Sequence, residues 1–306
     1  MPNSRRPWSG LLLLCLVLGI ARQAHSQTTF TVNSTDSVAD GTCDATHCSL
    51  DDAIIAANGS PGADVITFNI LPGGVTHTLT RSTAAPTITE AVAIDGYTQP
   101  GSQVNTTIMG GLDAIIRIEV QASSPSVPEG FRIASSNVTI RGLAVSNFQS
   151  NFYVPDGVWS NIAIAGNFIG TNADGTAAAS SQNGVTCVGC SGVTVGGSTA
   201  ATRNLIAGNS AKGISATRAA ATTITLTVRG NLIGTNKTMT GALGNGIGVF
   251  VDIPSGAASG DRILIGGLNG ANGIEESNVI AGNLSNGIQI QRTLGSDVTG
   301  LSLIHI

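Results

Sequence analysis

The sequence contains few charged residues. Asp, Glu, Lys and Arg make up 10% of its 306 residues, whereas a typical globular domain has about 25%. The formal net charge is -4 and no basic stripe occurs, which excludes the electrostatic surface that a nucleic-acid-binding protein needs. Disorder is excluded as well, because Val, Ile and Leu are abundant and regularly spaced, whereas disordered chains combine low hydrophobicity with high charge.

Long hydrophobic runs are lacking after the N-terminus. No later stretch approaches the roughly 18 to 20 apolar residues that a membrane-spanning helix requires, so we expect no membrane span. Near the N-terminus, Arg5 and Arg6 precede an apolar run over residues 11–20. The small-x-small pattern "AHS" follows at residues 24–26. This arrangement is typical of a signal peptide, here residues 1–26. It predicts export to an extracellular or cell-surface location.

Glycine, by contrast, is abundant, with 40 residues, and it marks a repeat. A Gly followed by apolar residues in alternate positions recurs 27 to 41 residues apart, at Gly130, Gly157, Gly184, Gly213, Gly246 and Gly287. Repeats of this length are typical of stacked architectures. The alternation indicates a strand with one face turned inward.

Each repeat contains two more strand patterns. The second is an apolar-x-apolar segment followed by a glycine that permits a sharp bend, at Gly142, Gly166, Gly197, Gly230 and Gly267. The third is exemplified by "GNFIGTN" (166–172), which returns as "GNLIGTN" (230–236). Three short strands per repeat can pair with their copies in the next repeat, about 4.8 Å away. We therefore predict an all-β fold, a right-handed parallel β-helix with three short strands per coil over residues 129–306.

An asparagine recurs after the third strand of each repeat. Asn tolerates left-handed backbone geometry and bonds to local backbone groups, and stacked copies can form a ladder. Because a binding site is usually made once whereas this residue recurs in five coils, we predict a structural turn ladder rather than a ligand site. The predicted members are Asn147, Asn172, Asn209, Asn236 and Asn283.

Residues 27–128 follow the coil pattern less closely and are predicted to form a cap and the first coils. Strand-like runs occur at 30–32, 65–68, 77–80 and 92–95. Ser49 followed by Asp52, before an apolar run, is a capping-box pattern that predicts a short helix ending near residue 59. Since bare strand edges and an open core invite aggregation, we expect this helix to cover the first coil.

The same region carries recognisable motifs. "CSLDDAI" (48–54) stands between "FTVNSTDSVADGTC" (30–43) and "ADVITFNI" (63–70), and "VAIDGYTQPGS" (92–102) and "SSNVTIRGLAVSNF" (135–148) follow. These segments resemble the CSLREAI-type domain and the β-helix repeats of secreted bacterial proteins. The resemblance implies fold and export, and no particular activity. Asp51 and Asp52 depart from it, because they stand where the family name implies Arg and Glu.

Four cysteines follow the signal peptide, in two close pairs. In an exported protein we expect Cys43 and Cys48 to form a disulfide. Cys187 and Cys190 form a CxxC pattern. Because Cys187 falls in an inward column, a disulfide and a buried thiol both remain open, whereas a zinc site would need a second Cys or His pair.

The candidates for catalysis are three residues. β-Helix enzymes that cleave polysaccharides need convergent carboxylates, and only Glu129 and Asp156 share a column of the repeat, with Lys212 two coils beyond Asp156. The competing interpretation is a solvated strand edge, where charges guard against unwanted pairing. The scattered His47, His77 and His305 suggest no metal cluster, and we expect no metal or cofactor.

These features favour a secreted or cell-surface scaffold that serves adhesion, glycan binding or structure. Its expected partners are glycans or cell-surface components. The alternative is a polysaccharide lyase or glycoside hydrolase built on the same fold. The final segment, "TGLSLIHI" (299–306), provides no third strand or cap for its coil, which predicts a chain truncated at its C-terminus.

Overall fold

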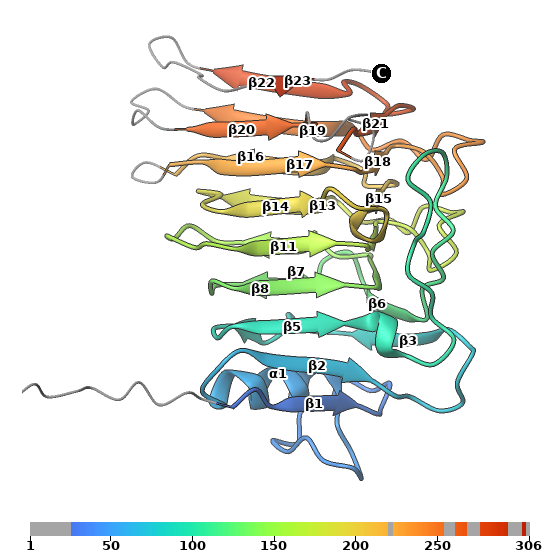
Figure 1. Cartoon of the computed structure of the whole chain (residues 1–306), viewed down its shortest axis with the longest axis vertical. Coiled ribbons are helices and arrows are strands. Elements are labelled where there is room, and N and C mark those ends of the chain that lie inside the picture. The colour runs from blue at the N-terminus through green and yellow to red at the C-terminus, as the bar shows by residue number, and fades with distance from the viewer. Residues whose placement is uncertain (1–25, 220–222, 254–260, 268–275, 293–301, 304–306) are drawn as a thin grey trace, which may run out of the picture.

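The computed structural model describes residues 26–219, 223–253, 261–267, 276–292 and 302–303, and these form a stack of coils (Figure 1). Three sheets run along the stack, and every strand pairing within them is parallel. Sheet A has the order β1 (Thr29–Val32), β2 (Asp64–Phe68), β5 (Val92–Asp95), β8 (Val138–Arg141), β11 (Ile162–Ala165), β14 (Val193–Gly196), β17 (Thr225–Arg229), β20 (Arg262–Ile265) and β23 (Ser302–Leu303).

Sheets B and C have seven strands each. Sheet B consists of β3 (His77–Arg81), β6 (Ile118–Ala122), β9 (Leu143–Ser146), β12 (Phe168–Ile169), β15 (Leu205–Ile206), β18 (Leu232–Ile233) and β21 (Val279–Ile280). Sheet C consists of β4 (Thr87–Ile88), β7 (Glu129–Ile133), β10 (Ser150–Val154), β13 (Asn183–Val188), β16 (Lys212–Thr217), β19 (Ile247–Ile253) and β22 (Ile288–Arg292). The predicted parallel β-helix with three strands per coil is confirmed.

The bend between sheets A and B depends on glycine. Gly142, between β8 and β9, has φ of +74°, and a Cβ there would lie 2.6 Å from the backbone N of Tyr97. Both the left-handed backbone and the close approach therefore require glycine. In two later coils the glycine with positive φ is Gly196 or Gly266, one residue before the predicted Gly197 and Gly267.

Two of the predicted landmark glycines are wrong. The sheet C strand predicted after Gly157 is β10 instead, where Phe152 pairs with Phe131 of β7, and Val158 is 86% exposed. Asn151 takes the place of the landmark glycine in this coil and is fully buried, which is why the glycine pattern missed it. In β19 the landmark is Gly248 rather than Gly246, since Ile214 pairs with Val249.

A helix covers the first coil, as predicted. α1 (Leu50–Gly59) begins with a capping box in which the Ser49 hydroxyl accepts from Asp52 N and the Asp52 carboxylate accepts from Ser49 N. The helix buries Leu50, Ala53 and Ile54 among other apolar side chains of the main core, and it packs against β1, β2 and β4. The four strand-like runs predicted in this region correspond to β1, β2, β3 and β5.

A strap, defined here as residues 99–117, runs along the stack rather than around it (Figure 1). It leaves the short 3-10 helix η1 (Gly96–Thr98) and reaches the loop after β18, where Leu112 N donates to Lys237 O at 2.7 Å. The strap brings apolar side chains against the outside of sheet B, which forms a second core. This core contains Leu112, Ala114, Ile116, Ala144, Phe168, Ala173, Leu205, Ala207 and Leu232. Both apolar residues of β12, β15 and β18 are therefore buried, one facing each core.

The asparagine that directly precedes the third strand of four coils belongs to a buried ladder, which we call the GN ladder after the "GN" of "GNFIGTN" and "GNLIGTN". Its members are Asn167, Asn204, Asn231 and Asn278. Each one hydrogen-bonds to the next through its backbone or side-chain amide, with distances of 2.8 to 3.0 Å. The side-chain amides also donate to backbone carbonyls of sheet A, for example from Asn204 to Ile164 O at 2.8 Å.

The predicted turn ladder of five asparagines is wrong as a single column. Asn209 and Asn283 do belong to a ladder, but Asn245 stands between them. Asn172 and Asn236 instead close surface loops, where their side-chain oxygens accept from the backbone N of Thr176 and Thr240. Asn147 has φ of +65° and donates to Ala122 O. The five residues therefore share a position in the sequence pattern and not a position in space.

Both cysteine pairs form disulfides, Cys43 with Cys48 and Cys187 with Cys190. Cys187 is 1% exposed and stacks between Val154 and Ala216 in the inward column of sheet C. The signal peptide, apart from Ser26, and His305 lie outside the described residues. Residue 128 is the predicted end of the N-terminal region. Each of the three sheets contains strands from both sides of this residue.

Candidate functional site

Sheet C presents two neighbouring columns of side chains on its outer side, which together we call the sheet C face. The first column is Glu129, Ser150, Asn183 and Lys212, and the second is Arg132, Tyr153, Thr186, Ser215, Phe250 and Gln289. Successive members of a column belong to successive coils, about 4.8 Å apart. In the second column the strand register therefore repeats a polar or aromatic position at each coil, whereas the first column continues from Lys212 into Ile247.

Contacts between the columns hold these side chains in place. Ser150 Oγ lies 2.8 Å from Thr186 Oγ1, and Arg132 donates to Glu129 at 3.1 Å. The Arg132 guanidinium also lies over the Tyr153 ring, 4.9 Å from its centroid, and Lys212 Nζ lies 3.9 Å from the centroid of Phe250. Each cation is attracted by the negative face of its ring, so the charged groups lie along the sheet.

The three catalytic candidates do not form one cluster. Glu129 and Lys212 share a column, but Ser150 and Asn183 stand between them, so the two are three coils, or about 14 Å, apart. Asp156 lies outside the column, because it follows the end of β10. The sequence placed Asp156 beside Glu129 only through the misassigned landmark at Gly157, so the prediction that these acids share a column is wrong.

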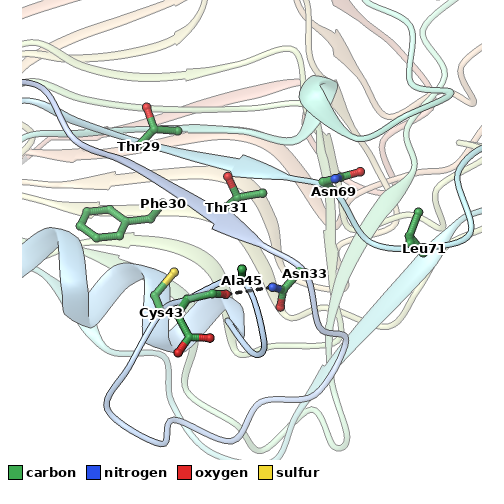
Figure 2. A pocket seen from close by; sticks show the side chains of 9 residues that line it. Thr29, Phe30, Thr31, Asn33, Cys43, Ala45, Asn69 and Leu71 are labelled. Carbon is green, nitrogen blue, oxygen red and sulfur yellow. Dashed lines mark hydrogen bonds between the residues drawn. The ribbon is translucent and has the colours of Figure 1, made fainter.

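Another surface of interest lies at the opposite end of the molecule from β22. It is a groove of about 490 Å³ between β1 and the loop over residues 33–48, with Thr29, Thr31, Asn33, Cys43 and Leu71 among its lining residues. Figure 2 shows Asn33 at the start of this loop, where its side-chain amide donates to Asp44 O, near the end of the loop, at 3.0 Å. This bond joins the two ends of the loop.

Arg132, Tyr153 and Thr186 are surface residues of interest that the sequence pattern did not predict. The available signal was the alternation in "SNFYV" (150–154), in which Phe152 and Val154 are buried and Tyr153 is partly exposed. It was overlooked because the landmark glycine is absent from that strand. No aromatic motif elsewhere in the repeats marks the column.

The described residues contain no helix that is long and apolar enough to cross a membrane. The parallel β-helix and its two disulfides fit a generic extracellular β-helix protein, since disulfides persist in oxidising compartments. A comparison with protein-family models finds no match to the chain. A comparison with curated protein sequences finds none either.

Proposed function

We propose that the protein is an exported β-helix scaffold that binds glycans along the sheet C face. The observation that carries the proposal is the regular spacing of hydroxyl, amide and cationic side chains around Tyr153, one set per coil. A polysaccharide that runs across the strands would meet a new set at each coil. Repeated weak contacts of this kind add up through avidity.

The chemistry of the face suits sugars. The hydroxyl group of Thr186 and the amide group of Asn183 are partly exposed. Both can donate and accept hydrogen bonds, as sugar hydroxyls do. Tyr153 combines an apolar ring with a polar tip, so it can pack on a sugar face while its hydroxyl stays in water. Arg132 and Lys212 add positive charge, which favours glycans that carry carboxylates or sulfates.

Export is part of the same proposal. It is supported by the N-terminal signal-peptide pattern, by the two disulfides and by the resemblance of residues 30–148 to CSLREAI-type secreted proteins. A scaffold role agrees with the wide separation of Glu129 and Lys212 and with the position of Asp156 outside their column. We therefore propose binding rather than cleavage as the activity of the sheet C face.

Replacement of Tyr153 by Ala is expected to weaken glycan binding at least tenfold, because it removes the ring at the centre of the face. Arg132→Ala is expected to have a similar effect on acidic glycans. Both are measured as retardation of the purified protein in gels that contain acidic or neutral polysaccharides. Arg117→Ala is the matched control, since Arg117 belongs to the strap and bonds to Gly101 O, away from the sheet C face.

Equal retardation of all three variants would contradict the proposed binding face. The same samples are assayed for new reducing ends and for unsaturated sugar products. Cleavage that disappears in Glu129→Gln would replace the scaffold proposal with an enzymatic one.

A further inference from the structure

The loop over residues 33–48 lies below α1 and β1 in Figure 1. Two of its residues, Asp40 and His47, lie close to Asp52 of α1, and the three are potential metal ligands. His47 Nδ1 lies 3.3 Å from Asp40 Oδ2 and 3.6 Å from Asp52 Oδ2. One ligand atom from each of the three residues lies within 4.8 Å of the others. This cluster belongs neither to the sheet C face nor to the catalytic candidates.

The spacing of the cluster fits a tetrahedral metal ion. Zinc binds His nitrogen at about 2.0–2.1 Å and carboxylate oxygen at about 2.0–2.2 Å, so two such ligands of a tetrahedron lie about 3.4 Å apart. The observed separations from Nδ1, 3.3 and 3.6 Å, lie on either side of this value. A histidine with two carboxylates is a ligand set suited to zinc and similar transition metals, whereas calcium takes oxygen ligands.

A second observation is the orientation of His47. Its Nδ1 atom is buried, has no hydrogen-bond partner among the described residues and faces the two carboxylates. Its other ring nitrogen, Nε2, lies 3.1 Å from Asp36 Oδ2. Metal-bound histidines usually donate their second N–H to a carboxylate, which fixes the tautomer and the ring. Asp36 is placed for that role and leaves Nδ1 as the free ligand atom.

The rest of the site is held in position before any ion arrives. Asp52 is at the N-terminus of α1, where Ser49 and Gly41 donate to its carboxylate. Among these donors only the Ser49 hydroxyl can rotate. Its rotation away from Asp52 frees a lone pair on Asp52 Oδ2 for a metal ion. The disulfide of Cys43 and Cys48 closes the loop around His47. Such pre-organisation lowers the ordering cost of binding.

We propose that Asp40, His47 and Asp52 form a site for a zinc-like divalent metal ion, with Asp36 as the positioning residue of the histidine. Asp40 is about half exposed, so the ion has a route from solvent. Three protein ligands leave the fourth position for water or for a group from a partner. The site would fasten the 33–48 loop to the helix that covers the first coil.

The competing occupant is a proton. The hydrogen bond to Asp36 raises the pKa of His47, and the charges of Asp36, Asp40 and Asp52 act in the same direction. Asp44 is the other acid of the loop, and it accepts from the backbone N of His47. A protonated imidazole would satisfy these carboxylates without metal. Because a ligand histidine must be deprotonated, zinc affinity is expected to fall as the pH falls.

The test is titration of the disulfide-bonded mature chain with ZnCl₂ at pH 7.5, followed by calorimetry. We expect one ion per chain, and at least a tenfold loss of affinity in His47→Gln and in Asp40→Asn. Asp40→Asn changes an exposed side chain, so it separates loss of a ligand from loss of the fold. Asp174→Asn, which changes an exposed acid of another loop in the same way, is the matched control and should bind as the parent does.

A second readout identifies the atom that binds. Cobalt(II) in place of zinc should give the visible absorption of a tetrahedral ion, and zinc should shift the Nδ1 resonance of His47. Zinc binding that is equal in His47→Gln and the parent would overturn the proposal. So would the lack of any binding at millimolar zinc while the His47 resonance still titrates with pH, which would assign the cluster to the proton.

Discussion

Replacement of Arg81 by Met is expected to lower the free energy of unfolding by about 3–5 kcal/mol, because it leaves a buried carboxylate without its partner. Arg81 is 2% exposed and forms an ion pair with Asp51 of α1. It also donates to Gly130 O at 2.8 Å and lies over the ring of Phe131. One side chain thus joins the capping helix to β7, and its loss removes all these contacts together.

The loss of stability in Arg81→Met is expected to depend on pH through the ionisation of Asp51. Burial raises the pKa of Asp51, and Arg81 opposes that rise. Without Arg81 the folded protein holds the proton on Asp51 more tightly than the unfolded chain does. Ionised Asp51 therefore destabilises the folded protein. This free-energy cost is absent when the pH is below the pKa of Asp51 in the unfolded chain, near 3.8. It reaches its full size once the pH exceeds the raised pKa of Asp51 in the folded protein. We expect Arg81→Met to be less destabilising at pH 4 than at pH 7.

Urea unfolding followed by circular dichroism measures these differences. Arg117→Met, in which the lost arginine is partly exposed, is the control and should change stability by less than about 0.5 kcal/mol. The double variant Asp51→Asn/Arg81→Met removes both charges and should recover part of the loss. A loss below about 1 kcal/mol in Arg81→Met would mean that the ion pair does not fasten the helix.

The sequence predicted the coils because the inward residues obey simple periodicity. Ile140, Ile164 and Val195 lie one above another in sheet A, as the alternating pattern required. The glycine pattern failed in β10, where Asn151 occupies the position that Gly130 occupies in β7. Ser181 Oγ donates to the buried Asn151, and Asn151 donates to Asn209. These partners belong to the next coils of the stack but lie 30 and 58 residues away in the sequence, so the local sequence does not reveal them.

The second core was also hidden from the sequence. Phe168 and Leu205 were interpreted as members of strands with one inward face, yet they are buried on the outer side of sheet B. Their cover, the strap, begins about 70 residues or more before them in the chain. Arg203 helps to fix it by donating to Thr107 O and Gly110 O. Long-range contacts of this kind depend on the assembled stack and leave no periodic signal.

The acidic cluster around His47 could have been found. Asp36, Asp40 and Asp52 lie within 11 residues of His47 in the sequence, on either side of the short loop that the disulfide closes. The histidines were considered as a set of three scattered residues, and His47 was not compared with its neighbouring acids. The capping box fixes Asp52 at the helix start, and that placement brings it back toward the histidine.

The GN ladder is expected to contribute far more to stability than the loop asparagines that share its motif. Asn204→Leu should destabilise the protein by about 3–5 kcal/mol, since each buried polar group left without a partner costs about 1–3 kcal/mol. Three groups lose their partner, namely the backbone N of Asn167, Ile164 O and Asn231 Oδ1. Leucine has a similar size, so the change tests hydrogen bonding more than volume.

Asn172→Leu is the comparison variant. Asn172 is the second asparagine of "GNFIGTN" (166–172), and the first, Asn167, is the ladder neighbour of Asn204. Asn172 closes a surface loop by accepting from the backbone N of Thr176 and Ala177, and water can replace these bonds. We therefore expect a loss of only about 0.5–1.5 kcal/mol, measured by the same urea unfolding. Equal losses in both variants would show that the ladder is not the main polar support of the stack. A large loss in Asn204→Leu alone would show that the first asparagine of the motif supports the wall between coils, whereas the second shapes a replaceable loop.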